Sequence, residues 1–261
     1  MKKAYVDTEA GQIHFRFREG KGTPIICLHQ TASSSAMFDS FMDSYAGDEP
    51  IYALDTPGFG RSYDPDGQPD MGEYAKMLIA AIDSLGIDNF HVFGHHTGAS
   101  IGIEIADLVA ERTSSLMMIG PVVLTDEERE QFATIYPKPF EPKADASHLQ
   151  EMWDYIKSIG PNISLELQHR EMVDTARAWE GHIKVYNQIW NQDFASLYDG
   201  IKAPMLIMCS PDDVLWPIFE RAKERRPDAK VVELGGSNFQ TDEVPQQVAS
   251  ALQDFLQSLN K

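Results

Sequence analysis

The sequence predicts an α/β fold with a mostly parallel central sheet that is covered by helices on both faces. Short apolar runs of strand length alternate along the chain with longer segments of helical spacing. Such alternation is typical of a parallel sheet whose strands are connected by helices. A charged, aromatic-rich segment of helical character interrupts the alternation once, so we expect a helical subdomain inserted before the last two strands.

The expected strands form an N-terminal hairpin followed by a parallel series. Residues 4–7 and 12–17 flank the turn Glu9-Ala10-Gly11, which predicts the hairpin. Continuous apolar runs, typical of strands covered on both faces, follow at 24–28, 50–54, 90–93, 115–119, 204–208 and 230–234. Helices are predicted between and after these strands at 36–45, 71–85, 97–110, 217–226 and 244–259.

The interrupting segment is expected to form a lid. Thr125 and Glu128 have the spacing of a capping box that would open its first helix. Between 166 and 191, apolar residues recur at spacings of four and three, which predicts one amphipathic helix with the stripe Met172, Ala176, Trp179, Ile183, Tyr186 and Trp190. We therefore expect a core of residues 1–124 and 201–261 and a lid of residues 125–200, whose stripe packs on the core or roofs a pocket.

Composition limits the partners that the chain can have. The 261 residues carry a net charge of -18, which disfavours nucleic acid and anionic membrane surfaces as partners. Lys2 and Lys3 precede polar residues, and no stretch approaches transmembrane length, so we expect a cytoplasmic protein. Cys27 and Cys209 lie in apolar runs and are expected to be buried free thiols. A small molecule is the expected ligand, and the oligomeric state stays open.

The most informative motif is Gly94-His95-His96-Thr97-Gly98, which joins a predicted strand to a predicted helix. It has the frame of a G-x-S-x-G nucleophile elbow, in which a sharp turn lifts the central side chain out of the sheet. Here the lifted side chain is the imidazole of His96. The last histidine of the chain is His182, so the C-terminal region offers no imidazole to serve as a general base.

The chain resembles the α/β-hydrolase superfamily, and within it a branch that has histidine at the elbow. The resemblance covers almost the whole chain and rests on four segments in order: Leu28-His29-Gln30, the turn from Asp55 to Ser62, the elbow, and Asp213 followed by Pro217. It implies that Asp213 stands at the acid position and that Asn238 stands where the superfamily commonly has histidine. Gln30 likewise replaces a glycine of the usual strand-end turn.

The resemblance suggests a catalytic set of His96, Asp213 and Asn238. The Asn238 amide could donate to Asp213 and accept from one ring N–H of His96, leaving the other ring nitrogen free to act as base or nucleophile. Backbone N–H groups of Thr97 and of Thr31 or Gln30 would form an oxyanion hole. The expected pocket residues are His29, Trp153, Trp179, Tyr186 and Trp190.

Several alternatives remain open at the level of sequence. Ser33, Ser34 and Ser35 could reach the pocket, although a polar turn is the simpler explanation, and His29 with the two elbow histidines lacks acidic or cysteine ligands at metal-binding spacing. We expect no metal and no cofactor. The predicted activity is hydrolysis of an ester, lactone or C–C bond of a small carbonyl compound; the alternatives are lyase or decarboxylase chemistry and a catalytically silent binding protein.

Overall fold

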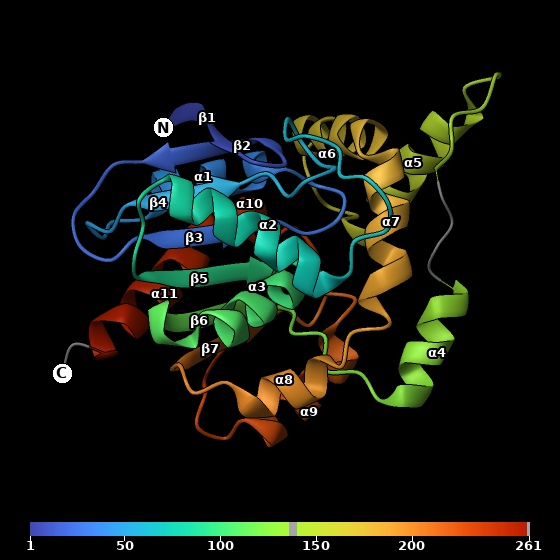
Figure 1. The fold of residues 1–261 in the computed structure, drawn as a ribbon. Helices are drawn as coiled ribbons and strands as arrows, with labels where there is room; N and C mark the ends of the chain where they lie inside the picture. The colour runs from blue at the N-terminus through green and yellow to red at the C-terminus, as the bar shows by residue number, and fades with distance from the viewer. Residues whose placement is uncertain (136–139, 260–261) are drawn as a thin grey trace.

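The computed structural model describes residues 1–135 and 140–259, whose strands form one sheet in the order β1-β2-β4-β3-β5-β6-β7-β8 (Figure 1). The strands are β1 (Lys2–Thr8), β2 (Gly11–Arg18), β3 (Ile25–Leu28), β4 (Ile51–Leu54), β5 (Phe90–His95), β6 (Thr113–Ile119), β7 (Met205–Cys209) and β8 (Lys230–Glu233). β1 and β2 form the predicted hairpin, β2 runs antiparallel to β4, and the remaining neighbours are parallel. The predicted α/β fold with a mostly parallel sheet is confirmed.

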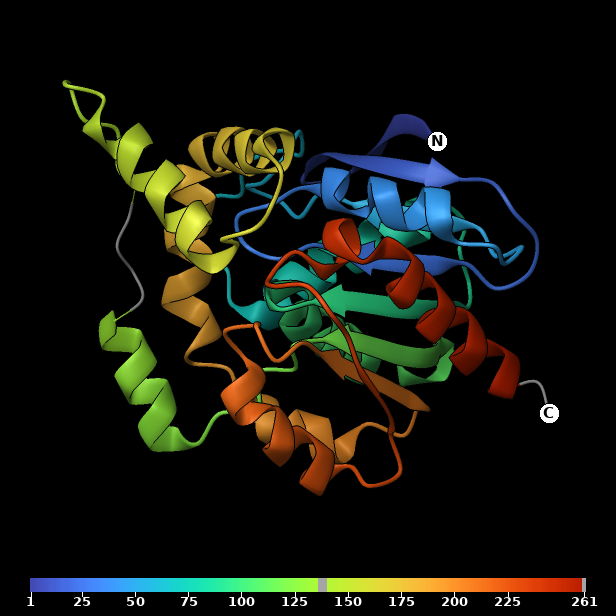
Figure 2. The same ribbon diagram turned by 180° about the vertical axis from the view of Figure 1, so that it is seen from behind.

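Helices cover both faces of the sheet. Those of the core are η1 (Ser35–Phe38), α1 (Asp39–Ser44), α2 (Met71–Ser84), α3 (Thr97–Leu108), η2 (Ala110–Arg112), α9 (Trp216–Arg225), α10 (Gln240–Glu243) and α11 (Pro245–Leu259). Helices α2 and α3 lie in front of the sheet in Figure 1, and α1 and α11 lie in front in the reverse view of Figure 2. Each predicted core helix is present, with ends that differ by a few residues.

Strand β3 shows how one apolar run provides core side chains on both faces of the sheet. Because side chains alternate along a strand, Ile26 and Leu28 join the apolar cluster beneath α2 and α3, whereas Ile25 and Cys27 join the cluster beneath α1 and α11. All four side chains are buried. A continuous apolar run is therefore what a strand between two helical layers requires, and this strand ends directly at the functional region.

The helical insertion lies between β6 and β7. Its helices are α4 (Asp126–Ile135), α5 (Ser147–Ile159), α6 (Leu165–Arg177), α7 (Trp179–Ile189) and α8 (Phe194–Gly200). The capping box before α4 is formed: Thr125 N–H donates to Glu128 Oε2 at 2.8 Å, and Glu128 N–H donates to Thr125 Oγ1 at 3.2 Å. Helices α4 to α7 lie beside the end of the sheet at which β5 finishes, whereas α8 packs against α3 (Figure 1).

The prediction of one helix over 166–191 is wrong. The helix is broken at Ala178, where φ is -96° and ψ is 22°, and α7 then approaches the Gly58 loop so closely that a Cβ on Gly181 would lie 2.5 Å from the Gly58 carbonyl oxygen. The buried face of α6 is also polar, consisting of Gln168, Glu171 and Thr175. Hydrogen bonds to core loops, rather than an apolar stripe, therefore decide how α6 lies.

Two simpler expectations concern thiols and membrane spans. Cys27 and Cys209 are free and buried, as predicted. Within residues 1–135 and 140–259, no helix combines the length and the apolar character that crossing a bilayer would require.

Candidate active site

His96 occupies a sharp turn between β5 and α3. Its φ of 49° and ψ of -109° lie outside the regions that L-residues ordinarily adopt, and such strained backbone is typical of functional positions. Gly98 permits the turn, because a Cβ there would collide with the carbonyl oxygen of Leu28. The spacing of the elbow motif thus places the His96 imidazole at the apex of the turn.

The His96 ring bonds directly to Asp213. His96 Nε2 lies 2.8 Å from Asp213 Oδ2, and Leu215 N–H donates to Asp213 Oδ1 at 2.8 Å. Burial alone would raise the pKa of the Asp213 carboxyl, but the His96 ring and these hydrogen bonds hold it below its usual value. Because an ionised carboxylate only accepts hydrogen bonds, Nε2 carries the proton of the neutral ring and Nδ1 keeps its lone pair.

Gln240 is a further partner of Asp213 that the sequence did not indicate. Its Nε2 donates to Asp213 Oδ2 at 2.6 Å, and its Oε1 accepts from Nε2 of His95 at 2.8 Å. His95 is fully buried, and desolvation lowers its pKa to about 3, so this ring is neutral at physiological pH. A directed chain of hydrogen bonds therefore runs from His95 through Gln240 to the carboxylate that orients His96.

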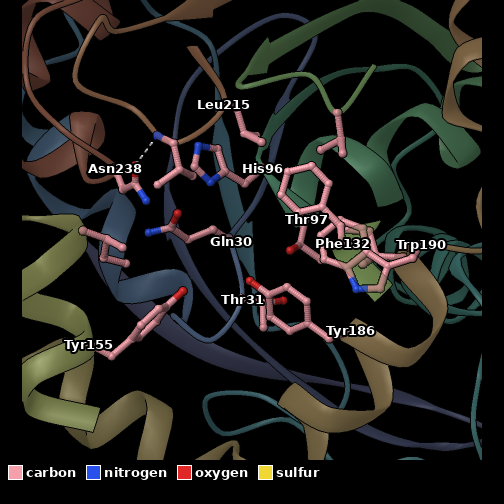
Figure 3. Close-up of a pocket in the computed structure, with 14 residues that line it drawn as sticks. Gln30, Thr31, His96, Thr97, Phe132, Tyr155, Tyr186, Trp190, Leu215 and Asn238 are labelled. Carbon is pink, nitrogen blue, oxygen red and sulfur yellow. Dashed lines mark hydrogen bonds between the residues drawn. The ribbon is translucent and has the colours of Figure 1, made fainter. Parts of the chain in front are cut away.

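Asn238 does not bridge His96 and Asp213, which corrects the sequence-based hypothesis. Its Oδ1 accepts the N–H of Val214 at 3.0 Å, the dashed bond in Figure 3. The Val214 N–H belongs to the turn after Asp213, and Asn238 supplies its acceptor. Asp213 consequently contacts His96 without an intermediary, and the amide group of Asn238 lines the pocket instead.

Backbone donors lie near the imidazole. Thr97 N–H begins helix α3, where the first N–H groups have no partner within the helix. In the described part of the chain, neither this group nor the N–H of Gln30 or Thr31 donates a hydrogen bond to another backbone or side-chain group. The three residues and His96 all line the same pocket, so these donors can serve a negative oxygen that forms beside the imidazole.

The pocket has a free volume of about 100 Å³ and lies between the elbow and the inserted helices (Figure 3). Its lining residues are Gln30, Thr31, His96, Thr97, Val122, Phe132, Tyr155, Ile159, Tyr186, Ile189, Trp190, Val214, Leu215 and Asn238. Figure 3 shows the aromatic rings of Phe132 and Trp190 on one side and the amides of Gln30 and Asn238 on the other. The pocket is thus apolar at one end and polar at the other.

Comparison with known protein families assigns the chain to one of them. The model of the alpha/beta hydrolase family matches residues 25–251. The chain belongs to this family. The putative carbamate hydrolase RutD of Azorhizobium caulinodans is 24% identical over 227 residues, which cover 82% of this chain and 83% of that protein. The N-acyl homoserine lactonase AidH has a similar structure, with a TM-score of 0.81, 20% identity, and coverage of 99% of this chain and 98% of that chain.

Another relative shares only a region of this alpha/beta hydrolase. The dihydrolipoyllysine-residue acetyltransferase component of the acetoin cleaving system of Pseudomonas putida is 27% identical over 111 residues. The match covers 42% of this chain and 30% of that protein. It therefore concerns a part of that longer protein.

Three residues expected in the pocket of this alpha/beta hydrolase lie elsewhere. Both ring nitrogens of His29 are engaged, because Nδ1 donates to Gln30 O at 2.8 Å and Nε2 accepts from Thr56 N–H at 3.0 Å. Trp153 lies two residues before Tyr155, on another side of α5. Trp179 lies two helical turns before Tyr186, at the far end of α7. Of the expected aromatic residues, Tyr186 and Trp190 line the pocket.

The same region contains a potential ligand set for a metal. One ligand atom each of His95, His96 and Asp213 lies within 4.8 Å of the others. Binding an ion there would compete with the bonds from Asp213 to His96 and Gln240. His29 is not a member of this group, so the histidine cluster considered from the sequence is not the one that the fold assembles.

The alternative serines of the sequence have other partners. Ser33 Oγ donates to Glu171 of α6, and Ser34 Oγ donates to Asp174 of α6 at 2.7 Å. In the described part of the chain neither hydroxyl is bonded to an imidazole, and Ser35 is buried. These hydroxyls therefore attach the inserted helices to the loop after β3, and no signal in the sequence pointed to this contact.

Proposed function

We propose that this alpha/beta hydrolase hydrolyses a small ester or lactone, with His96 as the general base that activates water. The observation that carries the proposal is the 2.8 Å bond from His96 Nε2 to Asp213 Oδ2 at the strained elbow. It favours the tautomer in which Nδ1 has the lone pair. In Figure 3 a ring nitrogen of His96 faces the side of the pocket occupied by Gln30.

The proposed reaction needs no covalent enzyme intermediate. Nδ1 of His96 accepts a proton as water attacks the carbonyl carbon, and the negative oxygen is held by N–H groups of Thr97 and of Gln30 or Thr31. The imidazolium is stabilised by Asp213 and returns the proton to the leaving oxygen when the C–O bond breaks. Atoms and charges balance with water as the only co-reactant.

The inserted helices complete the proposed site. We propose that residues 125–200 act as a lid whose residues Phe132, Tyr186 and Trp190 cover the reacting carbonyl and exclude bulk water. The division into this lid and a core of residues 1–124 and 201–261 follows the change from alternating elements to a purely helical segment. A cytoplasmic location remains a prediction from the sequence.

A substrate panel tests the proposal. Esters, lactones and β-keto acids are offered to the wild type, to His96→Ala and to the control His169→Ala, which changes an exposed histidine of α6. We expect hydrolysis that falls by about 10²- to 10⁴-fold in His96→Ala and is unchanged in the control. Release of carbon dioxide from the β-keto acids would indicate a decarboxylase instead, and tight binding without turnover would indicate a silent binding protein.

A further inference from the structure

Two buried side chains, Gln30 and Asn238, present amide NH₂ groups to the pocket that have no partner among the described residues. Gln30 and Asn238 are 4% and 3% exposed, and both line the pocket beside His96. In residues 1–135 and 140–259, no hydrogen bond is formed by the Gln30 side chain or by the amide nitrogen of Asn238. Because these groups open onto the pocket, a molecule bound there can supply the hydrogen-bond partners that amides in a protein interior normally have. The pair therefore points to a ligand.

The orientation of Asn238 is fixed by its neighbour. Because its Oδ1 accepts the N–H of Val214 at 3.0 Å, the opposite end of the amide, Nδ2, is the one presented to the pocket. Figure 3 shows the nitrogen ends of the Asn238 and Gln30 side chains next to each other, and the Gln30 oxygen on the side of His96. Since no partner among the described residues holds the Gln30 amide, its NH₂ group can turn to the same ligand atom as that of Asn238.

We propose that Asn238 and Gln30 form a donor pair that binds a second acceptor oxygen of the substrate, separate from the oxygen of the reacting carbonyl. The proposal rests on the proposed function for the position of that carbonyl beside His96. A carbonyl or amide oxygen has two lone pairs and can accept from both side chains. The pair then determines which carbonyl compounds the enzyme accepts.

The second acceptor belongs to a neutral group. Among the described residues that line the pocket there is no lysine or arginine, and the ionised carboxylate of Asp213 lies directly behind His96. The chain also carries a net charge of -18. A carboxylate in this place would be repelled and would lack a counter-ion, whereas an amide, ketone or ester oxygen would not.

The other end of the pocket accepts an apolar group. Val122, Phe132 and Trp190 line it, and the two rings stack with centroids 5.4 Å apart. The resulting substrate class is a neutral ester or lactone with a second carbonyl oxygen close to the reacting one and an apolar substituent directed under Phe132 and Trp190.

Two lactones of nearly equal shape test the donor pair. 2-Acetamido-γ-butyrolactone carries the second carbonyl, and 2-isobutyl-γ-butyrolactone replaces it with a methyl branch. We expect the wild type to prefer the first by about 10-fold or more in kcat/KM. Asn238→Asp keeps the acceptor for Val214 N–H but removes the donor, and Gln30→Met removes the other donor. Each should lower the preference by about 3- to 10-fold, whereas the exposed control Asn187→Asp should not change it.

A binding measurement separates this proposal from the proposed function. 2-Acetamidocyclopentanone and 2-isobutylcyclopentanone carry the same substituents and cannot be hydrolysed, and calorimetry gives their affinities for the wild type and the variants. One outcome is that neither lactone is hydrolysed, but the wild type binds the acetamido ketone more tightly than the isobutyl ketone and the Asn238 and Gln30 variants lose this difference. That outcome would support the donor pair and contradict the proposed function. Equal affinities for the two ketones, or equal losses for both lactones in the variants, would overturn the donor pair.

Discussion

His96 and Asp213 are 117 positions apart in the chain, yet Nε2 of the ring lies 2.8 Å from Oδ2 of the carboxylate. The contact places the imidazole at the elbow, where the usual motif has serine, and pairs it with the acid at the end of β7. The elbow thus carries an imidazole bonded to a carboxylate, and these are the groups that the proposed function uses as base and orienting acid. The elbow therefore differs from the usual motif in two ways: serine is replaced by histidine, and this histidine is bonded directly to Asp213.

Asp213→Asn should abolish activity without unfolding the protein. The amide oxygen of the new side chain would accept Leu215 N–H, as Asp213 Oδ1 does at 2.8 Å, so its NH₂ group would face His96 Nε2. Two donors cannot pair, and the ring would take the tautomer with the proton on Nδ1. We expect kcat to fall by about 10³- to 10⁴-fold. A melting temperature close to that of the wild type, together with this loss, would support an orienting role; retained activity would contradict it.

Gln240→Met should shift the pH dependence of the reaction. The variant keeps the length of the side chain but loses the 2.6 Å bond to Asp213 Oδ2 and the bond to His95. The bond lowers the pKa of Asp213, so its loss raises that pKa and the acid limb of the kcat profile moves to higher pH. At the plateau we expect a loss of about 10-fold. A plateau loss with an unmoved acid limb would indicate a structural role only.

The sequence predicted the fold because apolar runs define the strands, and the elbow glycines define the apex at His96. Asp213 was named from the resemblance to the α/β-hydrolase superfamily, and its direct bond to His96 was not predicted, because Asn238 was expected to lie between them. Gln240 could not be named, because a glutamine two residues after Asn238 has no sequence signature. Asn238 was given the wrong partner since its direction depends on Val214 N–H, a backbone donor of another turn.

The inserted helices were predicted less well for a related reason. The stripe from Met172 to Trp190 suits one long amphipathic helix, but Glu171 and Asp174 instead accept hydrogen bonds from Ser33 and Ser34 of the core. Such contacts between distant polar residues leave no periodic pattern. They matter nevertheless, because they fix helix α6 next to the loop that carries Gln30 and Thr31.

Asp174→Asn should stabilise the protein at neutral pH. Burial, with a contribution from Glu171, raises the pKa of Asp174 to about 6. Because its pKa is raised in the folded state, the Asp174 carboxyl contributes stability at pH values below its ordinary pKa. This contribution is lost as the pH rises through 6. The variant should therefore exceed the wild type by up to about 2–3 kcal/mol at pH 7.5 and lose its advantage near pH 4.

Denaturant titrations at the two pH values measure this difference, and the exposed carboxylate Asp154 provides the control Asp154→Asn. The amide oxygen that Asp174→Asn introduces can still accept from Ser34 Oγ, so the hydrogen bond to the core loop is kept. An advantage of Asp174→Asn that is equal at both pH values would show that titration of this carboxyl does not contribute.

Removal of metal ions should leave the activity unchanged. The potential ligands His96 and Asp213 are bonded to each other, and Asp213 also accepts from Gln240. We expect the same kcat before and after exhaustive dialysis against a chelator and less than one-tenth equivalent of transition metal by elemental analysis, a threshold of roughly the level of adventitious metal. Loss of activity on dialysis and its return with one metal would instead assign His95, His96 and Asp213 as ligands.

The double variant His96→Ser, Asn238→His should restore a serine nucleophile. In the wild type a fluorophosphonate probe should label no serine, because the elbow offers none. Replacing His96 with serine frees Asp213 Oδ2 from the ring that bonds to it at 2.8 Å, and a histidine at 238 would stand in the turn where the family commonly has its base. The volume lost at position 96 offsets part of the volume added at the buried position 238.

The two single variants are the controls. His96→Ser alone lacks a base, and Asn238→His alone keeps the elbow imidazole. Only the double variant should therefore be labelled stoichiometrically, as intact-protein mass spectrometry would show. Labelling of the wild type would contradict the role given to His96, and a folded but unlabelled double variant would show that the turn tied to Val214 cannot present a ring to Asp213.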